Sequence, residues 1–222
     1  MHRAIAPRRP PEGRPLASRT PLRLAPGLRV GLYGGSFNPP HEGHAHVAAY
    51  ARRRLHLDRI IWLVTPGNPL KSHSELEPLG QRLAEVRALA GRGDSVVTDL
   101  ERHIGSRYTV DTVRWLKARY PGVRFVWLMG ADNLAGFHRW KGWVDLMREV
   151  PVAVVSRPQL ALKSRFSPAA RRFASRRLPL EAAALLPDTA PPAWVYIPAP
   201  FRFVSSTALR KSRLKSGSAR AI

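Results

Sequence analysis

Strand-like and helix-like segments alternate along this chain from residue 28 onward. Strand patterns occupy 28–33, 59–65, 95–98, 124–129, 152–155 and 194–197, and helical patterns occupy 44–55, 79–90, 109–120 and 143–149. This alternation is typical of a parallel sheet whose two faces are covered by helices. The sequence therefore predicts an α/β fold built on a doubly wound parallel sheet.

The two ends of the chain lack this alternation. Residues 1–27 are rich in Pro and Arg and have almost no apolar periodicity, so we expect a disordered basic extension. Residues 28–214 should form the folded domain, interrupted at 156–193 by helical material and a proline-bearing linker at 187–192. Residues 215–222 should be a flexible basic tail.

Composition narrows the class of protein. The chain has no cysteine, which excludes disulfides and thiolate zinc sites and suits a reducing cytoplasm. No apolar run approaches the roughly 18 residues that a membrane helix needs. The formal net charge of +22 attracts anions, which include nucleotides, nucleic acids and acidic lipids, but does not choose among them.

The stretch GGSFNPPHEGH, at 34–44, joins the first predicted strand to the first predicted helix. Such junctions bind phosphate in α/β proteins, because backbone N–H groups and the positive helix end point at one place. Gly34 and Gly35 allow close backbone approach, and Ser36 adds a hydroxyl. His41 and His44 lie about one helical turn apart and can both donate to a phosphoryl oxygen. They could instead bind a metal, but two histidines are too few for a stable site and no third ligand is evident.

Two motifs in the same order resemble a known superfamily. GGSFNPPHEGH resembles the signature of the nucleotidyltransferases that have an H-x-G-H motif and a Rossmann-like fold. The segment SSTALR, at 205–210, is similar to the late S-S/T-T-x-x-R segment of that superfamily. The resemblance spans about residues 28–210.

Three further segments point to one branch of this superfamily. They are GNPLK at 67–71, YTVDT at 108–112 and GADNL at 130–134, and all three resemble the bacterial nicotinate-nucleotide adenylyltransferases. The resemblance implies transfer of AMP from ATP to nicotinate mononucleotide, which gives deamido-NAD and pyrophosphate. It also implies Mg²⁺ bound to ATP, held mainly by substrate and water.

The resemblance assigns roles to individual residues. His41 and His44 would stabilise charge on the transferred phosphoryl group. The residues expected to bind ATP are Gly34, Gly35, Ser36, Phe37, Gly130, Asp132, Ser205, Ser206, Thr207 and Arg210. Those expected to bind the mononucleotide are Lys71, Tyr108, Thr109, Trp140 and Lys141.

Structural roles compete with some of these assignments. Trp140 offers a flat face to a pyridine ring but could equally pack at the core or its rim. Asp132 could accept hydrogen bonds from ribose or cap a helix. Lys141 departs from the family, which often has a second aromatic residue there. The resemblance implies that the backbone N–H at this position binds the carboxylate, which leaves the side chain free to vary, and Lys141 could add charge attraction.

Other functions are compatible with parts of the sequence. Nicotinamide mononucleotide is the nearest alternative acceptor, and another adenylyl- or cytidylyltransferase could use the same loop. A class I aminoacyl-tRNA synthetase also has an H-x-G-H loop, but 222 residues leave no space for its tRNA-binding domain. A basic nucleic-acid-binding protein with this fold would need an aromatic-interleaved basic stripe, which is not evident, so no specific nucleic acid is expected.

Overall fold

The computed structural model describes residues 22–67, 76–91, 93–156 and 164–199. In this part of the chain the strands are β1 (Arg29–Gly35), β2 (Arg59–Val64), β3 (Ser95–Thr98), β4 (Arg124–Gly130), β5 (Val152–Ser156), β6 (Arg177–Leu178) and β7 (Trp194–Pro198). The α-helices are α1 (Glu42–Leu55), α2 (Leu79–Ala90), α3 (Leu100–His103), α4 (Thr109–Arg119), α5 (Ala131–Gly136), α6 (Trp143–Glu149) and α8 (Pro168–Arg172). The 3-10 helices are η1 (Phe137–Arg139), η3 (Ala174–Arg176) and η4 (Leu180–Asp188).

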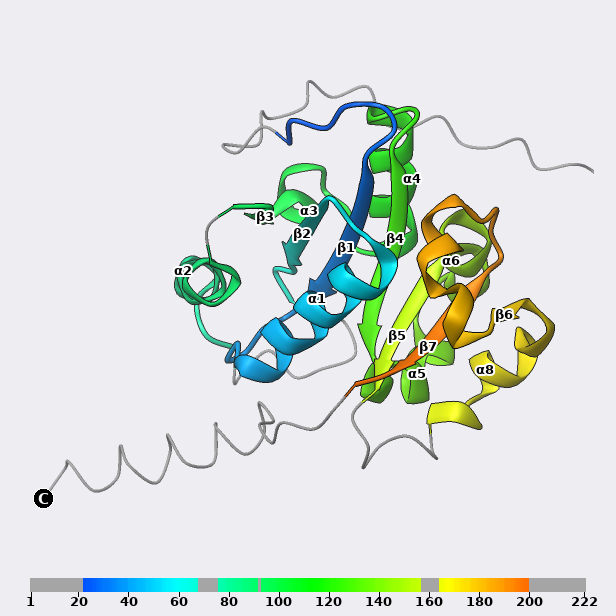
Figure 1. Cartoon of the computed structure of the whole chain (residues 1–222). Coiled ribbons are helices and arrows are strands. Elements are labelled where there is room, and N and C mark those ends of the chain that lie inside the picture. Colours follow the sequence, from blue (N-terminus) through cyan, green and yellow to red (C-terminus); the bar gives the residue numbers. More distant parts are fainter. Residues whose placement is uncertain (1–21, 68–75, 92, 157–163, 200–222) are drawn as a thin grey trace, which may run out of the picture.

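The strands form one sheet in the order β3-β2-β1-β4-β5-β7-β6, and every pair is parallel. From β1 the chain first builds β2 and β3 on one side and then β4 and β5 on the other (Figure 1). The predicted Rossmann-like α/β fold is therefore confirmed. In such sheets ligands bind at the carboxyl ends of the strands where the order reverses, which here lies between β1 and β4.

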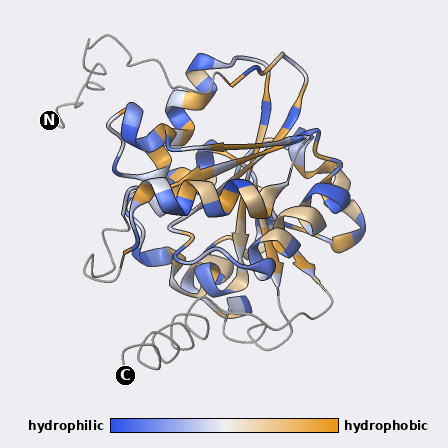
Figure 2. Cartoon of the chain, turned by 90° about the vertical axis from the view of Figure 1, so that its left-hand side faces the viewer, coloured by the Kyte–Doolittle hydropathy of each residue, from blue (hydrophilic) through white to orange (hydrophobic). Residues whose placement is uncertain are grey.

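Each face of the sheet carries its own apolar layer. On one face α4, α5, α6 and α8 pack over a cluster that includes Phe125, Trp127 and Trp194. On the other face α1, α2 and η4 pack over a cluster that includes Trp62 and Leu186. Figure 2 shows apolar strands enclosed by helices whose surfaces carry many hydrophilic residues. Burial on both faces explains why the central strands are almost wholly apolar.

The predicted elements are present with small shifts at their ends. The first strand continues through Gly35, and α1 begins at Glu42 rather than at His44. The short elements α3, α5 and β6 were not expected, because four, six and two residues are too few to show a period.

Two predictions about irregular segments need correction. Residues 22–27 are not a disordered extension, because Leu22 is buried in the core and the Gly27 N–H donates to the Gly122 carbonyl at 2.8 Å. Pro187 belongs to η4 rather than to a linker, and this helix packs on the sheet face beside α1. Its last residue, Asp188, forms ion pairs with Arg29 of β1 and Arg124 of β4.

No helix among the residues that the structure describes has the length and apolar character needed to cross a membrane.

Candidate active site

The site predicted from the sequence lies where β1 and β4 end. These strands are parallel neighbours, with Tyr33 opposite Leu128, so Gly35 and Gly130 finish at the same edge of the sheet. The glycine loop leaves from β1 into α1, and α5 begins directly after Gly130. The fold thus brings together two segments almost a hundred residues apart, at the position where the strand order reverses.

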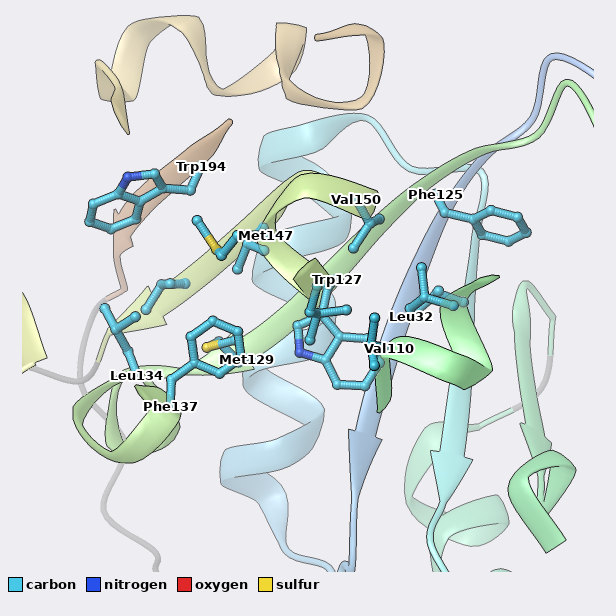
Figure 3. Close-up of a cluster of buried hydrophobic side chains, with 14 of the residues drawn as sticks. Leu32, Val110, Phe125, Trp127, Met129, Leu134, Phe137, Met147, Val150 and Trp194 are labelled. Carbon is cyan, nitrogen blue, oxygen red and sulfur yellow. The ribbon is translucent and has the colours of Figure 1, made fainter. Parts of the chain in front are cut away.

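Packing explains why the loop begins with glycine. A Cβ on Gly34 would lie 2.4 Å from Cη2 of Trp127, and a Cβ on Gly35 would lie 3.2 Å from the ring of Phe37. Figure 3 shows the Trp127 ring on one face of the sheet, between Phe137 and Val110. The two glycines therefore allow a bulky aromatic residue to pack on each face of the sheet at the end of β1.

Phe37 is a support of this loop rather than a side chain that faces a ligand. It is buried, with its backbone in the left-handed region at φ 45°. Its ring packs edge-on against Tyr33 and His44, at centroid distances of 5.5 and 5.1 Å, and also contacts Trp62. Any contact of Phe37 with a nucleotide must therefore come from its backbone.

The two histidines of the loop meet at the N-terminus of α1. His41 is the N-cap residue and His44 lies in the first turn, and their ring centroids are 3.9 Å apart. The backbone N–H of His41 donates to Nδ1 of His44 at 3.1 Å. A neutral imidazole that accepts at Nδ1 carries its proton at Nε2. His44 is thus arranged to donate a hydrogen bond from Nε2 beside the positive helix end.

The positions of His41 and His44 can be compared with the alternative that the two histidines bind a metal. The hydrogen bond to His41 already uses Nδ1 of His44. Within the part of the chain that the structure describes, no three His, Cys, Asp or Glu side chains gather as a metal-binding group. The geometry suits an anion better, because it combines imidazole and backbone donors.

Asp132 stands at the end of β4. It lies in the first turn of α5, whose N-cap is Gly130, and its Oδ1 would be 2.3 Å from a Cβ at Gly130. Asp132 is not the N-cap residue, but as the acidic residue of the first turn it faces the positive end of α5. The side chain is exposed and can accept hydrogen bonds from a ligand.

The fold also joins the segments predicted to bind the mononucleotide. Tyr108 is the N-cap residue of α4, 39% exposed, and Thr109 is the first helical residue. The turn after Trp140 reaches them, because Gly142, at φ +68°, packs against Val110, with its ideal Cβ position 3.0 Å from Cγ1. The N–H groups at the start of α4 therefore lie next to the turn that holds Trp140 and Lys141.

The structure places Trp140 at the rim of the apolar core. Its ring packs edge-to-face on Phe137 and Trp127, at centroid distances of 5.3 and 6.3 Å. The residue is nevertheless only half-buried, so part of the indole remains accessible. Lys141 beside it is exposed.

Sequence reasoning missed three residues near the site. Trp127 links Gly34 to Trp140. Glu101 of α3 accepts a hydrogen bond from Thr112 of α4 at 3.4 Å, and burial raises the pKa of Glu101 despite this bond. Arg82 of α2 is buried and donates to the carbonyl of Ser36 at 2.7 Å. The sequence does carry one indication that Arg82 is buried. Arg82 lies beside Leu83 and four residues before Val86, on the apolar side of its helix.

The remaining predicted residues, Lys71, Ser205, Ser206, Thr207 and Arg210, lie outside the described residues.

Comparison with known proteins defines the class. The family model described as Cytidylyltransferase-like matches residues 32–212. A Plasmodium falciparum nicotinic acid mononucleotide adenylyltransferase, solved in complex with NaAD, has the same fold with a TM-score of 0.61 at 18% identity, over 83% of each chain. The fold and the glycine loop are thus those of a cytidylyltransferase-like nucleotidyltransferase.

Curated relatives narrow this class. A protein of Caulobacter sp. (strain K31) named "Probable nicotinate-nucleotide adenylyltransferase" is 63% identical over 188 residues, which cover 85% of this chain and 100% of the relative. A protein of Methylorubrum extorquens with the same name is 52% identical over 183 residues, covering 82% of this chain and 99% of the relative. The chain belongs to the nicotinate-nucleotide adenylyltransferase family.

Proposed function

We propose that this protein transfers AMP from ATP to nicotinate mononucleotide, forming deamido-NAD and pyrophosphate in NAD biosynthesis. The observation that carries the proposal is the placement of His44. Its Nδ1 accepts from the His41 backbone, so its Nε2–H is a donor at a helix N-terminus beside the glycine loop. The names of relatives at 52–63% identity support the same acceptor.

The reaction is an in-line displacement at the α-phosphorus of ATP. An oxygen of the mononucleotide 5′-phosphate forms a new bond to the α-phosphorus. The bond between the α-phosphorus and the oxygen that bridges it to the β-phosphorus breaks, and pyrophosphate leaves with that oxygen. The attacking phosphate is already ionised, so the protein need not supply a nucleophile, and its task is positioning and charge stabilisation. His41, His44, Ser36 and the N–H groups at the start of α1 would donate to the phosphoryl oxygens.

The acceptor would bind between α4 and the turn before α6. Nicotinate carries a carboxylate, which suits the N–H groups and positive end of α4 at Thr109 and the hydroxyl of Tyr108. The exposed part of the Trp140 indole would stack on the pyridine ring, and Lys141 would add charge attraction. Asp132 would accept from a ribose hydroxyl of the ATP moiety.

Other parts of the proposal depend on residues outside the described ranges. Ser205, Ser206, Thr207 and Arg210 would bind the β- and γ-phosphates, and Lys71 the mononucleotide phosphate. Mg²⁺ would arrive with ATP, bound by triphosphate oxygens and water. A cytoplasmic location would suit this chemistry.

A pyrophosphate-release assay with ATP and a panel of acceptors tests the function. Nicotinate mononucleotide should give the highest kcat/KM, nicotinamide mononucleotide a lower value, and ATP alone no release. No release with either mononucleotide would overturn the proposed reaction. A higher kcat/KM for the amide would overturn the acid preference alone.

A further inference from the structure

Arg82 is a buried cation beneath the proposed phosphate loop. It lies in the first turn of α2, and only 1% of its surface is exposed. Burial lowers the pKa of its guanidinium, while the nearby charge of Glu77 opposes that shift. A buried guanidinium destabilises the fold unless its N–H groups are hydrogen-bonded. The hydrogen-bond partners of Arg82 therefore indicate what the side chain does.

Those partners are backbone carbonyls of separate segments. Nε donates to Glu77 at 2.8 Å, one terminal nitrogen donates to both Ser36 at 2.7 Å and Thr65 at 2.8 Å, and the other donates to Pro66 at 3.2 Å. Four of the five guanidinium N–H groups are therefore used. A single side chain joins the loop after β1, the end of β2 and the segment before α2.

Neighbouring hydrogen bonds strengthen the same junction. The Thr65 N–H donates to the Gly35 carbonyl at 3.1 Å, and the Glu77 N–H donates to Oδ1 of Asn38 at 3.1 Å. Asn38 lies between Ser36 and His41 in the glycine loop. The loop is thus held at two points against segments that Arg82 also binds.

We propose that Arg82 is a positioning residue for phosphoryl transfer, which holds the backbone of the glycine loop so that His41 and His44 meet the α-phosphate. This inference rests on the proposed function. Arg82 does not itself touch substrate, because it is buried and its donors point at carbonyl oxygens. Its effect should appear in the alignment of the reacting groups rather than in the binding of either substrate.

Lysine cannot reproduce this arrangement. A lysine keeps the charge, but its three donors radiate from one nitrogen, whereas the arginine donors are spread over a planar fork. The R82K variant would leave at least one of the four carbonyls without its partner. Because misplacement by about 1 Å can cost roughly 100-fold in rate, we expect kcat to fall by about 10- to 100-fold.

The experiment compares R82K with R87K, a matched variant at an exposed position of the same helix. Steady-state kcat, the Kd of each substrate by calorimetry and Tm are measured for both, each as a ratio to the wild type. We expect R82K to lose kcat while both Kd values stay within about threefold, and R87K to match the wild type. A lower Tm with unchanged kcat for R82K would show a merely structural role and overturn the proposal.

A second variant keeps the test decisive if R82K does not fold. Asn38→Ala removes the acceptor for the Glu77 N–H and loosens the same junction from the loop side. A reduced kcat with retained substrate Kd values supports the proposal, and an unchanged kcat overturns it. The proposed function fails separately, if the wild type itself releases no pyrophosphate with the acceptor panel.

Discussion

Replacing Gly34 by alanine tests how tightly the two substrate regions are packed together. The new Cβ would lie 2.4 Å from Cη2 and 3.0 Å from Cζ2 of Trp127. Since carbon atoms pack at about 3.5–4.0 Å, at least one partner must shift by about 1 Å. Neither moves easily, because Gly34 is in a central strand paired on both sides and Trp127 is 1% exposed.

Overpacking of this kind typically costs about 1–3 kcal/mol. For a chain of this size each kcal/mol lowers Tm by about 2–4 °C, so Gly34→Ala should melt roughly 2–12 °C below the wild type. A shift of Trp127 would also displace Trp140, because the two rings pack edge-to-face. We therefore expect the KM for the mononucleotide to rise more than the KM for ATP.

Thermal melting and pyrophosphate-release kinetics measure both effects. Gly80→Ala is the control, because nothing lies within 4 Å of its ideal Cβ position and it is exposed in α2. Alanine in a helix is more stable than glycine by up to about 1 kcal/mol, so this variant should melt slightly higher with unchanged kinetics. If Gly34→Ala keeps the wild-type Tm and both KM values, the inferred rigidity of the contact with Trp127 is wrong.

Three further predictions test individual side chains. His44→Asn retains an acceptor for the His41 N–H but loses the Nε2 donor. We expect kcat to fall by about 10²–10³-fold with little change in Tm. Near-normal turnover would contradict a catalytic role for His44. Trp140→Ala should weaken binding of the mononucleotide in calorimetric titrations while ATP binding changes little, and equal losses would argue against stacking. Burial raises the pKa of Glu101, so protonation stabilises the fold at low pH and this contribution is lost as pH rises. Glu101→Gln should therefore raise Tm at pH 7–8 but not below about pH 4, and an equal gain at both pH values would contradict this linkage.

The sequence predicted those parts of the molecule that depend on local pattern. Alternating strand-like and helix-like segments predicted the parallel sheet, and burial on both faces accounts for the nearly continuous apolar runs of β1 and β4. The glycine loop was found because its residue types are adjacent in the chain. The structure brings Gly35 and Gly130 to one edge, as an α/β topology requires, and joins Tyr108 to the turn after Trp140 through Val110 and Gly142.

Contacts between distant segments could not be predicted in this way. Nothing local shows that Trp127 fills the space beneath Gly34, because either residue alone has many ordinary explanations. Leu22 lies among prolines and arginines, and its burial depends on a surface that the rest of the fold creates. A polar residue on a helix is normally assigned to solvent, and only its placement beside Leu83 hints that Arg82 points inward.

The contacts between distant segments lie beneath the groups that we propose to bind the substrates. The groups proposed to meet phosphate are mostly backbone N–H groups and short side chains, which have little packing of their own. Their positions are determined one layer deeper, where Phe37 supports His44, Trp127 separates Gly34 from Trp140, and Arg82 binds the carbonyl of Ser36. Because His44 packs on Phe37 and Arg82 binds the loop backbone at Ser36, substitutions of these buried residues should alter turnover even though they touch no substrate.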